Sequence, residues 1–135
     1  MATALEYIGI ARMGAGIETG EDNAKALVKS GKAKLLIVAS DASDGAKRRA
    51  EGYVYGYSTP IAVTPYTKAE ISAMAGRPGC SMAAFRDLGL AASFAGALRN
   101  QFGEGYGALA QGLEAKWKRS RARSGRKTGN RRKNV

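Results

Sequence analysis

The distribution of apolar residues divides the chain into alternating strand-like and helix-like segments. The run KLLIVAS at 34–40 is continuously apolar between polar neighbours, which is typical of a strand that is covered on both faces. Two further strands are predicted at 60–65, between two prolines, and at 81–87. Residues 16–19 form a short extended segment.

Helices are predicted where apolar residues recur three or four positions apart. In segment 20–31 these positions are Ala24, Leu27, Val28 and Gly31. Such spacing indicates a helix that packs by one face. Further helices are predicted over 3–13, 41–57, 67–76 and 88–102. The candidate N-caps are Thr3, Thr19, Ser43 and Thr67. The alternation predicts the α/β class, as a three-layer α-β-α sandwich around a small mixed four-stranded sheet.

The basic residues gather at the C-terminal end. The formal net charge is +11, yet residues 1–115 hold 12 Lys and Arg against 11 Asp and Glu, whereas residues 116–135 hold 10 Lys and Arg and no acid. After Trp117 this segment has too little apolar surface to pack, so we expect a disordered arm. Such an arm binds a polyanion by releasing counterions, which favours nucleic acid. The alternatives are a solubilising tail and a contact with an acidic membrane surface.

Three parts of the chain are therefore expected. They are a folded domain over 1–102, a Gly-rich linker or short helix over 103–115, and a basic disordered tail over 116–135. In the middle part, Tyr106, Leu109, Leu113 and Trp117 recur at helical spacing. Four glycines within residues 103–112 oppose a helix there.

No group of residues points to catalysis, a metal or a cofactor. The chain has no histidine, and its one cysteine, Cys80, is expected to be a small buried hydrophobe in a reducing cytoplasm. The stretch GAGIETG at 14–20 lacks the preceding buried strand and the spacing of a dinucleotide-binding fingerprint. Asp41 and Asp44 are typical of turn and cap residues.

No apolar run approaches the roughly 20 residues of a membrane span, so no membrane partner and a cytoplasmic location are expected. A small α/β enzyme is the further alternative, and it requires a pocket with convergent polar groups.

Two blocks of sequence resemble one ribosomal protein family. The blocks are TGEDNAKALVKSGKAKLLIVASDAS at 19–43 and TPIAVTPYTKAEISAMAGRPG at 59–79. They resemble the family named L-seven-Ae and L-thirty-e, especially its small bacterial members of the YlxQ type, over roughly residues 4–98. The resemblance implies an α-β-α sandwich that binds RNA, typically a kink-turn.

The RNA-binding positions of that family fall on two segments of this chain. In the family, the start of the second helix enters the RNA major groove at tandem sheared G·A pairs, and the loop before the last strand closes on an extruded nucleotide. The corresponding residues are Gly20, Glu21, Asp22 and Lys25 at the helix start, and Gly76, Arg77, Pro78 and Gly79 in the loop. Lys29 and Lys32 follow Lys25 at i+4 and i+7 and are expected along one flank of the helix. A solvated helix face has the same pattern.

The helix start departs from the family pattern of threonine, asparagine and glutamate. Here glycine, Glu21 and Asp22 stand at those positions, while Lys25 is retained. An ionised Glu21 accepts hydrogen bonds but cannot donate one as asparagine does. Asp22 can accept from guanine amino and imino groups, and Lys25 can donate to guanine or phosphate. Arg77 stands where kink-turn-selective members often carry an aliphatic residue. The alternative is that the two acids only stabilise the first helical turn.

The sequence therefore predicts a non-catalytic RNA-binding protein that associates with the ribosome or with another structured RNA. The helix start would recognise a bent RNA, and the basic arm would add salt-sensitive affinity. The alternative is a protein-interaction module whose basic tail alone contacts RNA.

Overall fold

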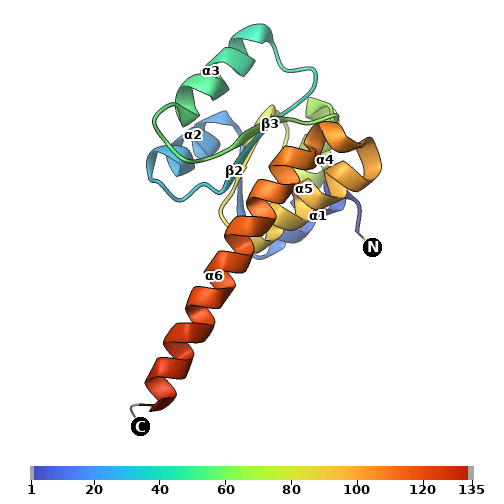
Figure 1. Ribbon diagram of the computed structural model, residues 1–135. Coiled ribbons are helices and arrows are strands. Elements are labelled where there is room, and N and C mark those ends of the chain that lie inside the picture. The colour runs from blue at the N-terminus through green and yellow to red at the C-terminus, as the bar shows by residue number, and fades with distance from the viewer. Residues whose placement is uncertain (1, 134–135) are drawn as a thin grey trace.

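The computed structural model describes residues 2–133, with side chains for residues 2–124. Its elements are α1 (Ala4–Met13), β1 (Ile17–Thr19), α2 (Glu21–Lys29), β2 (Leu35–Val38), α3 (Asp44–Val54), β3 (Ile61–Val63), α4 (Lys68–Ala75), β4 (Met82–Phe85), α5 (Leu88–Phe102), the 3-10 turn η1 (Glu104–Tyr106) and α6 (Gly107–Lys133) (Figure 1). The predicted order of helices and strands over the first 102 residues is confirmed.

The four strands form one mixed sheet in the order β1-β4-β2-β3. Strand β4 pairs antiparallel with both β1 and β2, whereas β2 and β3 run parallel. Ala84 of β4 lies opposite Glu18 on one side and Leu36 on the other. The two central strands are buried along their whole length, as the continuous apolar run in β2 predicts.

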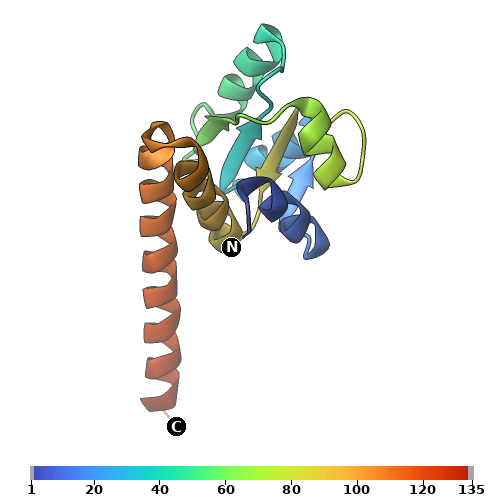
Figure 2. The same ribbon diagram turned by 90° about the vertical axis from the view of Figure 1, so that its right-hand side faces the viewer.

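Alternate residues of the central strands enter two separate hydrophobic cores. Leu35 and Ile37 of β2 pack with α1, α4, α5 and α6 on one face of the sheet. Leu36 and Val38 pack with α2 and α3 on the other face. Figures 1 and 2 show these two helical layers with the sheet between them. The predicted three-layer sandwich is therefore confirmed.

Local sequence signals define most helix ends. Thr3 and Thr67 each form a capping box, and the Ser43 side chain caps α3. Thr19, the candidate cap of the second helix, does not have this role: Gly20 is the N-cap of α2, and none of the described side chains caps this helix. The reason is that β1 extends through Thr19, which leaves the next residue to begin the turn.

Helix α6 begins in the segment for which a Gly-rich linker or a short helix was expected, and it continues through most of the segment for which a disordered arm was expected. Ala110 and Leu113 are buried in the core beside α5, and the helix then continues well away from the body (Figures 1 and 2). Once these docked turns have formed a nucleus, each further residue extends the helix at little cost, and Lys, Arg and Ala are good helix formers. The last two residues of the expected arm lie outside the described part of the chain.

Candidate nucleic-acid interface

The start of α2 and the loop between α4 and β4 meet at a hollow of about 440 Å³. Its lining consists of Gly20, Glu21, Asp22, Asn23, Arg77 and Gly79. All of these except Asn23 are residues that the family resemblance placed at the site. Gly76 and Pro78 belong to the same loop but do not line the hollow. We call this space the α2 hollow.

The backbone of Gly20 sets the start of α2. Its φ of +93° and ψ of 153° lie outside the range that other residues adopt readily. Its amide donates to the carbonyl oxygen of Met82 at 2.9 Å, which fixes the helix start to β4. Because no side chain among residues 2–124 caps α2, the amides of its first turn are not capped by this described part of the chain. Together with the helix dipole, they favour an anion or an acceptor oxygen at the hollow.

Arg77 forms the opposite rim of the α2 hollow. Its Nη1 donates to the carbonyl oxygen of Thr19 at 3.2 Å, and a Cβ atom on Gly20 would lie 3.6 Å from its Nη2. Gly76 and Gly79, with φ of +72° and +78°, form the turns that bring this loop to α2. A guanidinium has five N–H donors, and the bond to Thr19 engages one of them. Arg77 is exposed, so the group can also meet a ligand.

Glu21 ties α2 to α3. Its carboxylate accepts from Arg49 Nε and Nη2 at 2.7 and 3.0 Å, and from the Tyr53 hydroxyl at 2.6 Å. The hydrogen bonds from Arg49, and next the one from Tyr53, lower the pKa of Glu21 to about 2. Both carboxylate oxygens are therefore engaged inside the protein, and Glu21 holds the position of the helix start relative to α3.

The three lysines predicted to line α2 do not form a single row. Lys25 Nζ lies 5.4 Å from the centroid of the Tyr53 ring, and Lys29 Nζ lies 5.1 Å from that of Tyr57. Lys29 also donates to the carbonyl oxygen of Tyr53 at 3.2 Å. These two lysines face α3, whereas Lys32 lines a separate hollow on the other flank of α2, beside β1. Of the three, Lys25 lies nearest in sequence to the α2 hollow.

Sequence reasoning missed the roles that three residues have in this region. Asn23 lines the α2 hollow, and its Nδ2 donates to the carbonyl oxygen of Thr19 at 3.0 Å. Arg49 and Tyr53 hold Glu21 from α3. The i, i+4 spacing of Arg49 and Tyr53 places them on one helix face, but nothing in the sequence indicates that this face meets α2.

The carboxylates and the thiol outside the hollow have structural roles. Asp41 lies in a turn and its Oδ1 accepts from the amide of Lys68 at 2.8 Å, which agrees with its interpretation as a turn and cap residue. Asp44 is instead the first residue of α3, and Ser43 caps that helix. Cys80 is fully buried, as expected. Within the described residues, no three His, Cys, Asp or Glu side chains are grouped so that they could hold a metal ion. The same residues contain no helix with both the length and the apolar character that crossing a membrane requires.

Comparison with known proteins relates the chain to one curated relative. It is 33% identical over 75 residues to the RNA-binding protein YlxQ of Enterococcus faecium, and the match covers 56% of this chain and 72% of that protein. The chain belongs to the YlxQ family. This is the L-seven-Ae type of protein that the sequence resembles. No protein-family model matches the chain.

Two solved structures share the fold of this YlxQ-family chain. A protein of unknown function from Bacillus halodurans superposes with a TM-score of 0.65 at 22% identity, over 73% of this chain and 98% of that one. The 15.5kD RNA binding protein of Giardia lamblia superposes with a TM-score of 0.57 at 19% identity, over 71% and 84%. At these identities the matches concern the fold alone.

In this member of the YlxQ family, three kinds of group converge at the α2 hollow. They are the uncapped amides of the first turn of α2, the guanidinium of Arg77 and the carboxylate of Asp22. Hydrogen-bond donors and a carboxylate acceptor thus lie within one small space. Glycines at 20 and 79 leave the backbone accessible there.

Proposed function

We propose that this chain binds structured RNA and that its α2 hollow recognises a bent RNA of the kink-turn kind. The observation that carries the proposal is the bond from Arg77 to Thr19, which holds a cationic loop beside the uncapped start of α2. The name of the relative from Enterococcus faecium, an RNA-binding protein, supports the coarser statement that RNA is the ligand.

Each group at the hollow has a distinct role in this proposal. The amides of the first turn and the guanidinium of Arg77 bind phosphate oxygens, which positions the RNA without reading its sequence. Asp22 accepts hydrogen bonds from guanine amino and imino groups exposed by sheared G·A pairs. Lys25 donates to guanine acceptors or to phosphate. The glycines of loop 76–79 let its backbone approach an extruded nucleotide closely.

Glu21 takes a positioning role instead of a base contact. Its oxygens are bonded to Arg49 and Tyr53, so it keeps α2 at a fixed angle to α3. A fixed helix start suits recognition of RNA shape, because the amides must match phosphates whose positions the bend defines. We place the RNA partner among the structured RNAs of the cytoplasm, with ribosomal RNA as the first candidate.

An RNA titration with two matched duplexes tests this proposal. One duplex carries a bulge followed by tandem sheared G·A pairs, and the other is straight with the same base composition. The test variant is Asp22→Ala with Lys25→Ala. The control is Glu51→Ala with Lys68→Ala, which removes the same two charges at exposed positions outside the hollow.

We expect the unmodified chain and the control to prefer the bent RNA by about tenfold or more, which is the contribution of one good base contact. The test variant should bind both RNAs equally. A preference that survives in the test variant would show that the bend is recognised elsewhere. Equal binding of both RNAs by the unmodified chain would favour the alternative, a protein-interaction module whose basic tail alone contacts RNA.

A further inference from the structure

A second hollow, of about 250 Å³, lies between α6 and the loop that follows α2. Its charged lining residues are Lys34 from the loop and Lys116, Arg119 and Arg123 from α6. No Asp or Glu is among the lining residues, and Ser120 adds a hydroxyl. Four cations around one small space repel each other, so a bound anion would lower the energy of the arrangement. We call this space the α6 hollow.

The α6 hollow is built by the docking of α6 and is not a chance feature of a charged helix. Lys116 Nζ donates to the carbonyl oxygen of Ser58 at 3.4 Å, which attaches α6 to the segment before β3. A Cβ atom on Gly89 of α5 would lie 3.1 Å from the Trp117 ring, so α6 fits closely against α5. On the C-terminal side of this docked turn, Arg119 and Arg123 are one turn apart and therefore share a helix face.

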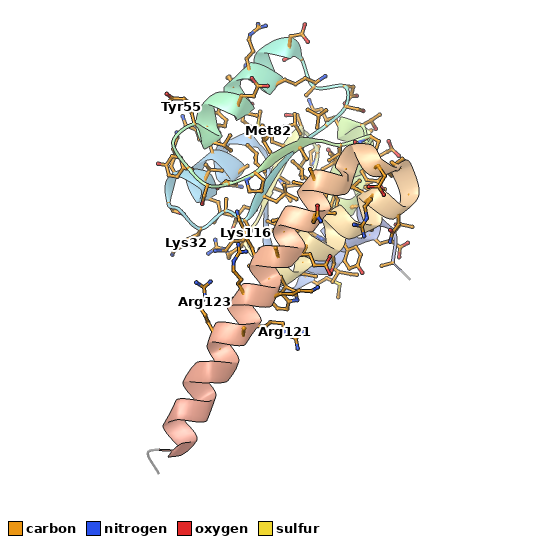
Figure 3. The ribbon with its side chains drawn as sticks, in the orientation of Figure 1. Lys32, Tyr55, Met82, Lys116, Arg121 and Arg123 are labelled. Atoms are coloured by element: carbon orange, nitrogen blue, oxygen red, sulfur yellow. The ribbon has the colours of Figure 1, made fainter. Side chains whose placement is uncertain are left out.

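The remaining described cations of α6 lie outside this hollow. Lys118 pairs with Glu114 at 3.3 Å, and the guanidinium of Arg121 lies 5.8 Å from the Trp117 ring centroid. Figure 3 shows Lys116 and Arg123 on the side of the helix toward Lys32, whereas Arg121 points to the other side. Among the described side chains, the helix thus carries a lining face with three cations and a second face with two, of which Lys118 is paired with Glu114.

The chemistry of the hollow fits a phosphodiester. Arginine binds phosphate through paired N–H donors, and two arginines one turn apart can hold neighbouring phosphates or one phosphate from two sides. A membrane surface is a poorer match. The sequence between Lys116 and Ser124 offers Trp117 and Ala122 as its apolar residues, which is not the broad apolar face of an interfacial helix.

The two hollows lie at opposite ends of α2. The α2 hollow is at its first turn, and the α6 hollow includes Gly31 and Lys34, which follow its last turn. A helix of nine residues is about 14 Å long, so one RNA can reach both. A third hollow lies along the flank of α2 between the two regions, and its lining includes Asn23 at one end and Lys32 at the other.

We propose that the α6 hollow is a second phosphate site, which grips the backbone of the same RNA that the α2 hollow recognises. This inference rests on the proposed function, because it takes RNA as the ligand. In this proposal, the lining face of α6 binds the RNA backbone at a fixed distance from the α2 hollow. The alternative is that all cations of α6 attract RNA equally, without a defined contact.

The test compares two charge-matched pairs of substitutions in the full chain. The test pair is Arg119→Ala with Arg123→Ala, and the control pair is Lys118→Ala with Arg121→Ala. Both remove two positive charges from the same stretch of α6, and both leave the Lys116 contact in place. Circular dichroism and thermal unfolding of each variant establish that α6 is retained. Binding of the bent and the straight RNA is then measured over a range of salt concentrations.

We expect the test pair to weaken binding of both RNAs by about tenfold or more and to reduce the slope of log K against log salt by about 2. The control pair should have less than half of that effect. Equal losses from both pairs would overturn the proposal, because undirected attraction would then explain the role of α6. Unchanged RNA binding combined with lost binding to anionic lipid vesicles would also overturn it and assign the hollow to membranes.

This experiment separates the second site from the proposed recognition site. If the unmodified chain binds both RNAs equally, but the two pairs still differ on the straight RNA, the α6 hollow stands and bend recognition at the α2 hollow fails. If a bent-RNA preference is present and the two pairs are equivalent, the α6 hollow fails alone. If the chain binds no RNA at low salt, both proposals fail.

Discussion

Arg77 Nη1 lies 3.2 Å from the carbonyl oxygen of Thr19, although 58 residues separate the two in the sequence. This bond joins the loop after α4 to the end of β1, at the residue before the turn into α2. The cation and the helix start at the α2 hollow therefore keep a constant relation to each other. Pre-organised donors of this kind lose little conformational entropy when they bind phosphate.

Replacing Arg77 tests the contribution of this loop to RNA binding. Arg77→Ala removes a charged donor from the rim of the hollow and should weaken RNA binding by about tenfold, since charge-assisted bonds are worth about 1.5 kcal/mol or more. Arg77→Lys should restore the charge but not the planar fork, and thus recover only part of the affinity. Arg99→Ala, on α5, is the control. Equal affinities of Arg77→Ala and the control in a fluorescence titration would remove Arg77 from the site.

Gly20→Ala should destabilise the fold. The backbone at this position has φ +93° and ψ 153°, and a Cβ atom there would also meet the Arg77 guanidinium. We expect a loss of about 2 kcal/mol in the free energy of unfolding, measured with urea. Gly112→Ala provides the contrast, because that helical position has nothing within 4 Å. It should stabilise α6 by up to about 1 kcal/mol, and a stabilising Gly20→Ala would contradict the observed backbone.

Glu21 predicts a specific dependence of stability on pH. Its pKa is about 2 in the folded chain against 4.5 for the free group. Because the folded pKa is lowered, the contribution of Glu21 is complete above about pH 4.5 and is lost as the pH falls toward about 2. The Arg49 and Glu21 side chains are 53% and 25% exposed, so solvent screening limits the contribution to about 1 kcal/mol or less.

Glu21→Gln measures this contribution directly. At pH 7 the variant should be less stable than the unmodified chain, and the difference should shrink through the acid range given above. Urea unfolding at a series of pH values follows the difference. Glu51→Gln, an exposed residue of α3, is the control and should show no such trend. A constant difference across the range would mean that the Arg49 contact does not depend on the charge of Glu21.

Leu113→Ala tests whether α6 is part of the folded body. Leu113 is 1% exposed and belongs to the core that α1, α4 and α5 share. Its truncation should lower the free energy of unfolding by about 3 kcal/mol, which is a typical cost of replacing a buried leucine by alanine. Gln111→Ala, on the exposed side of the same helix, should change it by less than about 0.5 kcal/mol. If both substitutions changed the free energy of unfolding by an equal, small amount, this segment would be a linker and not a docked helix.

The fold was largely predictable because its signals are local. The apolar run at 34–40 marks a strand buried on both faces, and it lies at the centre of the sheet. Thr3 and Thr67 mark helix starts because each forms its capping box with a glutamate three residues later. Such features involve neighbours in sequence, so the pattern alone contains them.

The parts that escaped prediction depend on contacts between distant segments. Glu21 meets Arg49 and Tyr53 across 28 and 32 residues, and no local pattern reveals that pairing. The segment after Trp117 was expected to be disordered because it lacks apolar residues. The lack of apolar residues indicates that this segment cannot pack by itself. It does not take into account the docked turns that precede the segment and nucleate the helix.

The shape of α6 gives the molecule a large electric dipole. Residues 1–115 carry a net charge of +1, whereas the last 20 residues carry +10, and the backbone of this last segment is a projecting helix up to Lys133. In the field of a polyanion, the molecule experiences a torque that turns this helix toward the polyanion before contact. The association rate should therefore depend strongly on ionic strength. The dissociation rate should depend instead on the short-range contacts that the folded domain makes after the encounter.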